Sequence, residues 1–215
     1  MNNERRTYTS ALRAEQTRLT QRRILDAGHR LFVEQGYGPT TIAAVAAAAE
    51  VSAQTVYNAF GSKPALLKHV YDVVLAGDDE PIPLAQRPEV QAMYALPDPA
   101  EFLRGYAGLA RTLSERLGPL MLVIAAGAGS GDPELTAHIE TTDGERLIGA
   151  GMAAGRVQEL GGLRPGLAAE AARDRLWTLT SIDVWRLLRL ARGWSADQYE
   201  DWIGEAMCAA ILARP

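Results

Sequence analysis

The chain has 215 residues, of which 47% are hydrophobic and 22% are charged, and its formal net charge is −4. These values exclude a wholly disordered chain and allow one large or two small domains with a buried core. No apolar run reaches the ~18 residues of a membrane-spanning helix, so no membrane partner is expected. The single cysteine, Cys208, excludes an internal disulfide framework. Together with an N-terminus that lacks a signal-peptide pattern, it predicts a cytoplasmic protein.

Charge is distributed unevenly along the chain. Residues 1–68 contain 9 Lys and Arg against 5 Asp and Glu, which gives +4, whereas residues 69–215 contain 13 against 21, which gives −8. A basic N-terminal third on an acidic body concentrates positive potential at one end, as nucleic-acid-binding proteins do. A chance imbalance on solvated faces is the alternative.

The N-terminal segment is rich in arginine and in small polar residues. Residues 1–19 are predicted to form a flexible basic arm, in which Arg5, Arg6 and Arg13 could contact phosphates or a minor groove. A disordered terminus without a function is the alternative. An amphipathic helix is predicted over residues 22–35, and Gly36 stands where a glycine commonly ends a helix.

Residues 41–63 have the pattern of two short helices joined by a tight turn. The first, over residues 42–49, is rich in alanine, which lets another helix cross it closely. Ser52 is a favourable N-cap for the second helix, whose Val56 can face inward while Gln54, Tyr57 and Asn58 stay exposed. Small residues on one helix and polar residues on the next predict a helix-turn-helix whose second helix reads the DNA major groove. The alternative is an ordinary pair of packed helices.

A set of spaced positions between residues 20 and 72 carries a family resemblance. Its members are Ile24, Leu25, Asp26, Ala27, Leu31, Phe32, Gln35, Gly36, Tyr37, Thr40, Thr41, Ile42, Val51, Ser52, Thr55, Val56, Tyr57, Phe60, Ser62, Lys63, Leu66 and Leu67. On these residues the chain resembles the tetracycline-repressor (TetR) family of bacterial transcription regulators. It departs from the family at Glu50, where glycine is usual, and at Gly28, a mid-helix glycine that costs about 1 kcal/mol in helix propensity.

The resemblance implies an all-α protein with an N-terminal three-helix helix-turn-helix domain and a C-terminal helical domain for ligand binding and dimerisation. It also implies that Thr41, Tyr57 and Lys63 grip DNA phosphates. Gln54 and Asn58 carry amides that suit adenine N6 and N7, and Ala53 and Thr55 would lie near the groove. The full set of predicted DNA-binding residues is Thr41, Ser52, Ala53, Gln54, Thr55, Tyr57, Asn58 and Lys63.

The predicted domains are the arm at residues 1–19, the helix-turn-helix domain at 20–68 and the C-terminal domain at 69–215. A fourth helix is expected from Ser62 to Gly77, followed by an acidic and proline-rich connection. Five helices are predicted after residue 98, over about 98–113, 117–126, 132–160, 166–192 and 195–213. The glycines at 127–131 resemble a phosphate loop. No strand precedes them and no Gly-Lys-Ser/Thr follows, so a flexible connection is predicted.

The C-terminal domain is predicted to hold an effector pocket and the dimer interface. Candidate pocket residues combine aromatic rings with a few hydroxyls, although a plain core is the alternative: Phe102, Tyr106, Met121, Ile124, Trp177, Thr178, Ser181 and Trp185. The family implies dimerisation through the last two helices. These helices are predicted to offer more apolar surface than one acidic subunit needs, through Leu176, Leu179, Trp185, Leu188, Trp202, Ile203 and Ile211.

No pattern of residues predicts catalysis, a metal site or a cofactor. His29, His69 and His138 lie far apart in the sequence without metal-ligand spacing, and there is no dinucleotide fingerprint. The motif and the family resemblance together predict a sequence-specific DNA-binding transcriptional regulator rather than an enzyme. The resemblance alone implies a repressor that a small-molecule effector releases. Its predicted partners are a double-stranded DNA operator with dyad symmetry, a second copy of the chain and an unidentified effector. The alternative is a helical ligand-binding or scaffolding protein that does not bind DNA.

Overall fold

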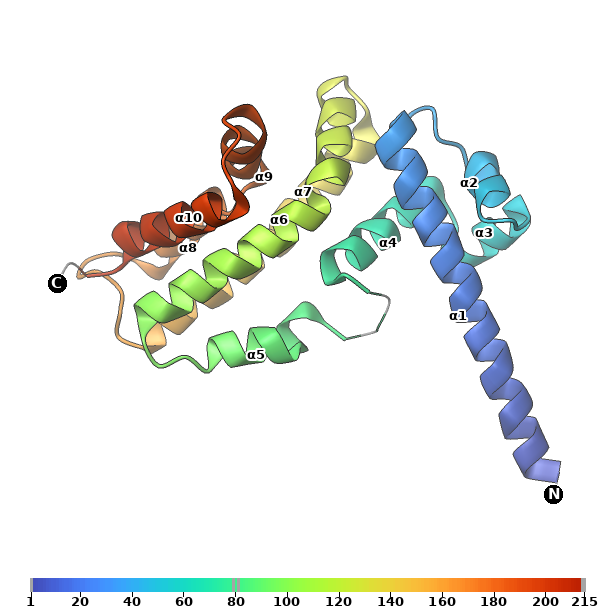
Figure 1. Cartoon of the computed structure of the whole chain (residues 1–215), viewed down its shortest axis with the longest axis horizontal. Helices are drawn as coiled ribbons and strands as arrows, with labels where there is room; N and C mark the ends of the chain where they lie inside the picture. The colour runs from blue at the N-terminus through green and yellow to red at the C-terminus, as the bar shows by residue number, and fades with distance from the viewer. Residues whose placement is uncertain (1, 79, 81, 214–215) are drawn as a thin grey trace. The chain divides into compact units, whose positions relative to one another are not determined.

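The computed structural model describes residues 2–78, 80 and 82–213, with side chains from residue 15 onward. The elements are α1 (Asn2–Gln35), α2 (Ile42–Ala48), α3 (Ala53–Phe60), α4 (Lys63–Ala76), η1 (Leu84–Gln86), α5 (Pro88–Tyr94), α6 (Pro99–Gly129), α7 (Pro133–Glu159), α8 (Ala169–Leu179), α9 (Ile182–Trp185), η2 (Arg186–Ala191) and α10 (Ala196–Ile211) (Figure 1). Within these residues the only β pairing is an isolated bridge between Leu163 and Leu212. The predicted all-α fold is confirmed.

The chain divides into two compact units. The first contains residues 1–79 and 122–138, and the second contains residues 80–121 and 139–215. This division differs from the domains predicted from the sequence. All of α4 belongs to the first unit, because its buried residues pack toward α1. The end of α6 and the start of α7 belong to the same unit, although they follow α4 by more than 40 residues in the chain.

Helix α1 begins at Asn2, twenty residues before the predicted start. No glycine or proline interrupts the first 27 residues, and residues 10–19 are rich in good helix formers, so the backbone stays helical through the predicted arm. The side chains of Arg5, Arg6 and Arg13 lie outside the described part of the structure, so their role stays a prediction. At its other end α1 stops as predicted, because Gly36 adopts a φ of +88°.

Gly28 lets α1 and α4 cross closely. A Cβ atom at this position would lie 3.3 Å from Cγ2 of Val70, which is closer than most such contacts. Around the crossing the two helices bury large apolar side chains of both elements: Ile24, Phe32, Leu66, Leu67 and Val70. The glycine that costs helix propensity in α1 is therefore the residue that admits Val70 of α4. Helix α2 packs against α1 and helix α3 packs against α4, so this crossing positions both of them.

The second unit has its own core, in which large side chains of α6, α8 and α10 pack together with buried residues of α7, among them Ala150, Ala153 and Val157. Helices α8 and α10 lie side by side (Figure 1). Fully buried side chains come from all three helices and include Phe102, Leu103, Leu176, Tyr199, Ile203 and Ile211. The prediction that the last two helices carry surplus apolar surface is wrong for Leu176, Trp185, Ile203 and Ile211. These four side chains are buried inside their own subunit.

Helix α6 runs unbroken from Pro99 to Gly129, whereas two helices were predicted there. Pro119 lies inside it and faces outward, while Leu120 and Ile124 are fully buried. An outward proline leaves the buried stripe of a helix intact, so packing sustains the helix despite the missing backbone donor. The predicted helix over 166–192 is instead divided. It ends at Leu179, and Ser181 caps a new start by accepting a hydrogen bond from the N–H of Val184 (3.3 Å).

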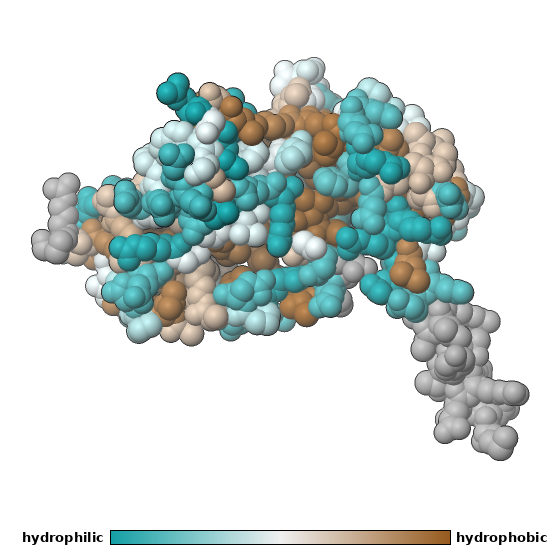
Figure 2. All heavy atoms as spheres, in the orientation of Figure 1, coloured by the Kyte–Doolittle hydropathy of each residue, from teal (hydrophilic) through white to brown (hydrophobic). Residues whose placement is uncertain are grey.

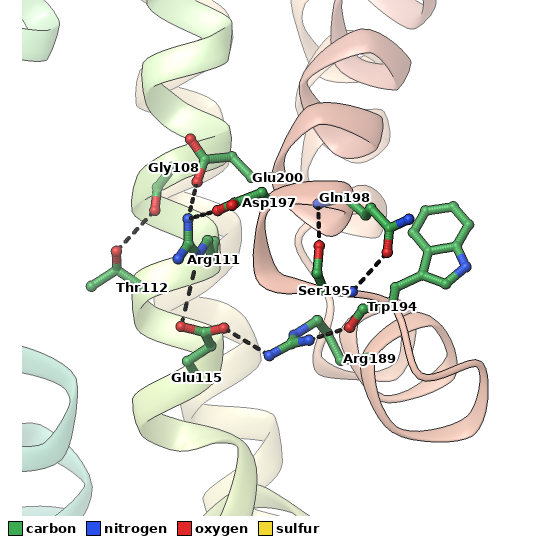
Figure 3. Close-up of polar contacts among 10 residues, drawn as sticks. All are labelled: Gly108, Arg111, Thr112, Glu115, Arg189, Trp194, Ser195, Asp197, Gln198 and Glu200. Carbon is green, nitrogen blue, oxygen red and sulfur yellow. Dashed lines mark hydrogen bonds and ion pairs between the residues drawn. The ribbon is translucent and has the colours of Figure 1, made fainter.

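A polar cluster fastens α6 to the start of α10 and to η2 (Figure 3). Arg111 Nη1 lies 2.8 Å from Glu200 Oε2 and 3.0 Å from Asp197 Oδ1. Glu115, one turn further along α6, pairs with Arg189 Nη2 at 3.2 Å. Ser195 and Gln198 form a capping box at the start of α10. Since Asp197 is 83% exposed and the other four side chains are 25–34% exposed, each pair contributes modestly, and the network mainly fixes the register of α10 on α6.

Hydrophilic residues cover most of the face shown in Figure 2, and hydrophobic residues form smaller patches. In the described residues, no helix combines the length and apolar character that crossing a membrane demands. The same residues contain no group of three or more His, Cys, Asp or Glu side chains placed to hold a metal ion. Among the described residues, the large exposed apolar side chains of the second unit are Ile82, Ile148, Met152, Leu187, Leu190 and Trp202.

Candidate nucleic-acid interface

The turn between α2 and α3 places a glutamate in a conformation that normally favours glycine. Glu50 has a φ of +56°, the only positive φ among the described non-glycine residues. The backbone around it closes in a Schellman pattern, with Val51 N–H donating to Ala46 O at 2.9 Å and Glu50 N–H to Ala47 O at 3.2 Å. The turn thus has a left-handed residue of the kind that glycine usually supplies, at a cost of about 1–2 kcal/mol in backbone strain. The exposed glutamate side chain does not alter the path of α3.

Helix α3 starts at a capped and solvent-exposed end. Ser52 Oγ accepts the N–H of Thr55 at 3.1 Å and lies 2.8 Å from the Thr55 hydroxyl. The predicted N-cap is therefore present, and Ala53, partly exposed, is the first residue of the helix. Val56 is fully buried and anchors α3 to its unit. The opposite side of the helix consequently faces outward.

That outward side carries the predicted base-reading residues. Gln54 and Asn58 are exposed, and Gln54 Nε2 donates to Asn58 Oδ1 at 2.8 Å. The pair leaves one amide oxygen and further N–H donors directed to solvent, so it offers acceptor and donor together, as an adenine edge requires. Tyr57 is 49% exposed on the same short helix. A large aromatic side chain left this open on an eight-residue helix is available to a partner.

Two further predicted phosphate contacts lie at helix starts. Thr41 caps α2 by accepting the N–H of Ala44 at 3.1 Å, and its hydroxyl remains exposed and free to donate. Lys63, the first residue of α4, is held more firmly than predicted. Its Nζ lies 3.9 Å from the centroid of the Tyr37 ring and donates to Gly38 O at 3.3 Å. Burial lowers the pKa of Lys63, and the carboxylates of Glu134 and Asp132 act in the opposite direction.

The sequence did not indicate the residues that surround Lys63. Tyr37 was noted only as part of the family resemblance, and Glu134 was noted only as part of a helix start. Their link is a hydrogen bond from Tyr37 Oη to Glu134 Oε2 at 2.6 Å between residues 97 positions apart. The deep burial of Tyr37 and this hydrogen bond both raise the pKa of the phenol. No local pattern encodes a contact over such a separation.

The residues predicted to line an effector pocket are only partly brought together. Phe102 and Trp185 are buried in the core of the second unit, with Met121 nearly so, and Tyr106 stacks on Phe102 with ring centroids 6.3 Å apart. Trp177 packs against the same core, whereas Ile124 is buried in the first unit. The two hydroxyls serve local structure. Thr178 donates to Asp174 O at 2.8 Å, and Ser181 caps α9.

Buried polar groups lie in the interior of the second unit, and one of them, the hydroxyl of Tyr199, belongs to a residue that was not predicted to line the pocket. Trp185 Nε1 is buried without a hydrogen-bond partner, and Tyr199 Oη is buried without a hydrogen bond of normal geometry. Burial raises the pKa of Tyr199, and nearby Ser114 and Arg146 oppose that rise. Burial raises the pKa of Tyr106 to about 12. Unsatisfied buried polar groups each cost about 1–3 kcal/mol, which a bound polar ligand would offset.

Comparison with solved structures shows which known proteins share this fold. A TetR-family transcriptional regulator from Rhodococcus sp. matches with a TM-score of 0.69 at 15% identity, covering 90% of this chain and 98% of that one. A protein from Saccharomonospora viridis in complex with choline matches with a TM-score of 0.66 at 21% identity, covering 90% and 98%. NalD from Pseudomonas aeruginosa, the secondary repressor of the MexAB-OprM efflux pump, matches at 0.66 and 21%, covering 92% and 98%. At these identities the likeness establishes the fold.

The sequence of the first unit also matches the model of a known protein family. Residues 24–70 match the model for bacterial regulatory proteins of the tetR family. This range contains α2, the turn, α3 and most of the α1–α4 crossing. The predicted resemblance to the TetR family is therefore confirmed over these residues. A search of curated proteins found no significant match.

Proposed function

We propose that the chain is a sequence-specific DNA-binding repressor that a small-molecule effector releases from its operator. The observation that carries the proposal is the outward face of α3. There a hydrogen-bonded Gln54–Asn58 pair and a half-exposed Tyr57 lie opposite the buried Val56. A helix that only packed within its unit would not need this polar and aromatic face. The net charge of +4 on residues 1–68 supports binding to a polyanion.

The proposed roles follow from exposure and chemistry. Gln54 and Asn58 read bases, while Tyr57, the Thr41 hydroxyl and Lys63 hold phosphates. Ser52 and Thr55 shape and cap the N-terminus of α3, and Ala53 allows it to approach the groove. A homodimer would present two such helices to an operator with dyad symmetry.

Effector binding is proposed for the interior of the second unit. Its support is the buried Trp185 Nε1 and Tyr199 Oη, together with the aromatic side chains of Phe102 and Tyr106 around them in the same core. The structural relative from Saccharomonospora viridis was solved with choline, so this fold accommodates a small molecule. Binding would act by favouring the conformation with lower DNA affinity, and linkage requires operator DNA to weaken ligand binding by the same factor.

The test is selection of preferred sites from random DNA, followed by mobility shifts at several salt concentrations. The parent protein should give a dyad-symmetric site and a steep loss of affinity with salt. Gln54→Ala should relax the preference at one position of each half-site, at a cost of about 1–3 kcal/mol, because its amide no longer meets the base.

Gln35→Ala is the matched control, since it removes an exposed amide of the same unit from α1. It should leave the selected site unchanged. An identical site for Gln54→Ala and the parent would show that Gln54 is not a reader. Failure of the parent to select any sequence would favour the alternative, a helical ligand-binding or scaffolding protein.

A further inference from the structure

Three residues of the first unit form a connected group, here called the Lys63 seat: Lys63, Tyr37 and Glu134. The lysine ammonium rests over the Tyr37 ring at 3.9 Å from its centroid, and the Tyr37 hydroxyl donates to Glu134 at 2.6 Å. Tyr37 is 3% exposed, so its ring has a fixed position. A phenol that donates a short hydrogen bond to a carboxylate gains electron density in its ring, which strengthens the attraction for a cation.

The acidic side of the seat is itself held in place. Asp132 Oδ1 accepts the N–H groups of Glu134 (2.9 Å) and Leu135 (3.2 Å), which caps the first turn of α7. Glu134 therefore projects from a fixed helix start, and both carboxylates act electrostatically on Lys63. The lysine's charge is partly balanced within the protein before any DNA is present.

We propose that Glu134 is a positioning residue that restrains Lys63 and so sets how strongly this lysine contacts DNA phosphate. The inference rests on the proposed DNA-binding function. A phosphate that approaches the start of α4 must compete for the Lys63 ammonium with the Tyr37 ring and with the carboxylates of Glu134 and Asp132. Restraint by Glu134 thus lowers DNA affinity and makes the lysine's contribution to the salt dependence smaller than that of a free side chain.

The Lys63 seat also suggests how ligand binding in the second unit could change the contact between Lys63 and DNA phosphate. Glu134 is the second residue of α7, directly after the connection from α6, and both helices continue along the chain into the second unit. A ligand that shifts this connection changes the negative charge facing Lys63. The effect of ligand binding would then reach Lys63 through the connection between α6 and α7.

The experiment measures affinity for the selected operator against salt in a double-mutant cycle of the full chain. Glu134→Gln removes the charge but keeps an acceptor for Tyr37 Oη, so the fold is retained, which a thermal melt verifies. It should tighten operator binding about 3–10-fold and steepen the salt slope by up to about one. In the Lys63→Ala background the same substitution should have little effect, because no lysine remains to be released.

Glu34→Gln is the matched control, since it removes one exposed negative charge from α1 of the same unit. Its small effect should be the same with and without Lys63. The inference is overturned if Glu134→Gln acts equally in both backgrounds, which would indicate a general charge effect, or if it leaves affinity and salt slope unchanged. Operator binding by the parent in either case would leave the proposed function standing.

Discussion

At the scale of single residues, the structure gives physical reasons for both departures from the family pattern. Gly28 weakens α1 as a helix but admits Val70, and Glu50 accepts a left-handed backbone so that the turn keeps its shape. Neither reason could be read from the sequence. The first depends on a neighbour 42 residues away, and the second depends on the turn being held by the packing of α2 and α3.

One histidine gives a pH-dependent expectation. Burial lowers the pKa of His29, partly opposed by Asp26, and its Nε2 atom is buried without a hydrogen-bond partner. The folded state therefore binds the proton less readily than the unfolded state, whose histidine pKa is 6.5. The stability from this site is fully present above about pH 6.5 and declines as the pH falls below it.

His29→Gln should consequently reduce the loss of unfolding free energy between pH 7.5 and pH 5.5. The measurement is urea denaturation at both pH values. His69→Gln serves as the control, because that side chain is exposed, and it should keep the parent's pH dependence. An equal loss of stability in His29→Gln and the parent would assign the acid sensitivity to other groups.

At the scale of helices, sequence reasoning was strong for caps and weak for packing. Ser52, Ser62, Ser195 and the glycines that end α1 and α4 act as predicted, because capping depends on residues within one turn. The continuity of α6 through Pro119 and the break at Ser181 were missed, since both depend on what the helix packs against. Gln54, Tyr57 and Asn58, which are predicted to contact DNA, are exposed as expected, because their exposure follows from the helical spacing around Val56.

Two helical glycines of the second unit provide a matched test of packing. A Cβ at Gly149 of α7 would meet no atom within 4 Å, whereas one at Gly118 of α6 would lie 2.3 Å from the Trp185 ring. Gly149→Ala should raise stability by about 1 kcal/mol through helix propensity. Gly118→Ala should lower it by about 1–3 kcal/mol through overpacking. Thermal unfolding of both variants checks the pair, and a loss of stability in Gly149→Ala would contradict the open surroundings assigned to it.

At the scale of the whole molecule, the dimer expected from the family must use surface that the subunit leaves exposed. Four of the apolar residues predicted for this interface are buried in the subunit's own core, whereas Leu187, Leu190 and Trp202 of η2 and α10 stay exposed. On α7, Ile148 and Met152 are 68% and 50% exposed and lie one turn apart, and a Cβ atom added at Gly144 or Gly155 on the same face would meet no atom within 4 Å. An antiparallel second α7 would place Ile148 against Met152 of the other copy and Glu145 near its Arg156, so apolar and charged groups both match.

Ile148→Glu should therefore weaken the dimer at least 10-fold, measured by sedimentation at micromolar concentration. Leu187→Glu is the matched control, since it changes another half-exposed apolar side chain of the same unit. Weakening by Leu187→Glu alone would move the interface to η2. A parent that sediments as a monomer would remove the dimer from the proposed function.

The glycines of α7 have a consequence for the dynamics of this helix. Four of them, Gly144, Gly149, Gly151 and Gly155, fall within twelve residues, and relative to alanine they cost the helix ~4 kcal/mol of intrinsic propensity. Such a segment opens locally without global unfolding, so its amide hydrogens exchange with solvent sooner than those of α6. Packing of other helices or of a second copy against α7 compensates for this loss of helix stability. The amide exchange rate of α7 should therefore report whether a second copy is bound to it. This rate should fall as the protein concentration rises and the proposed dimer forms.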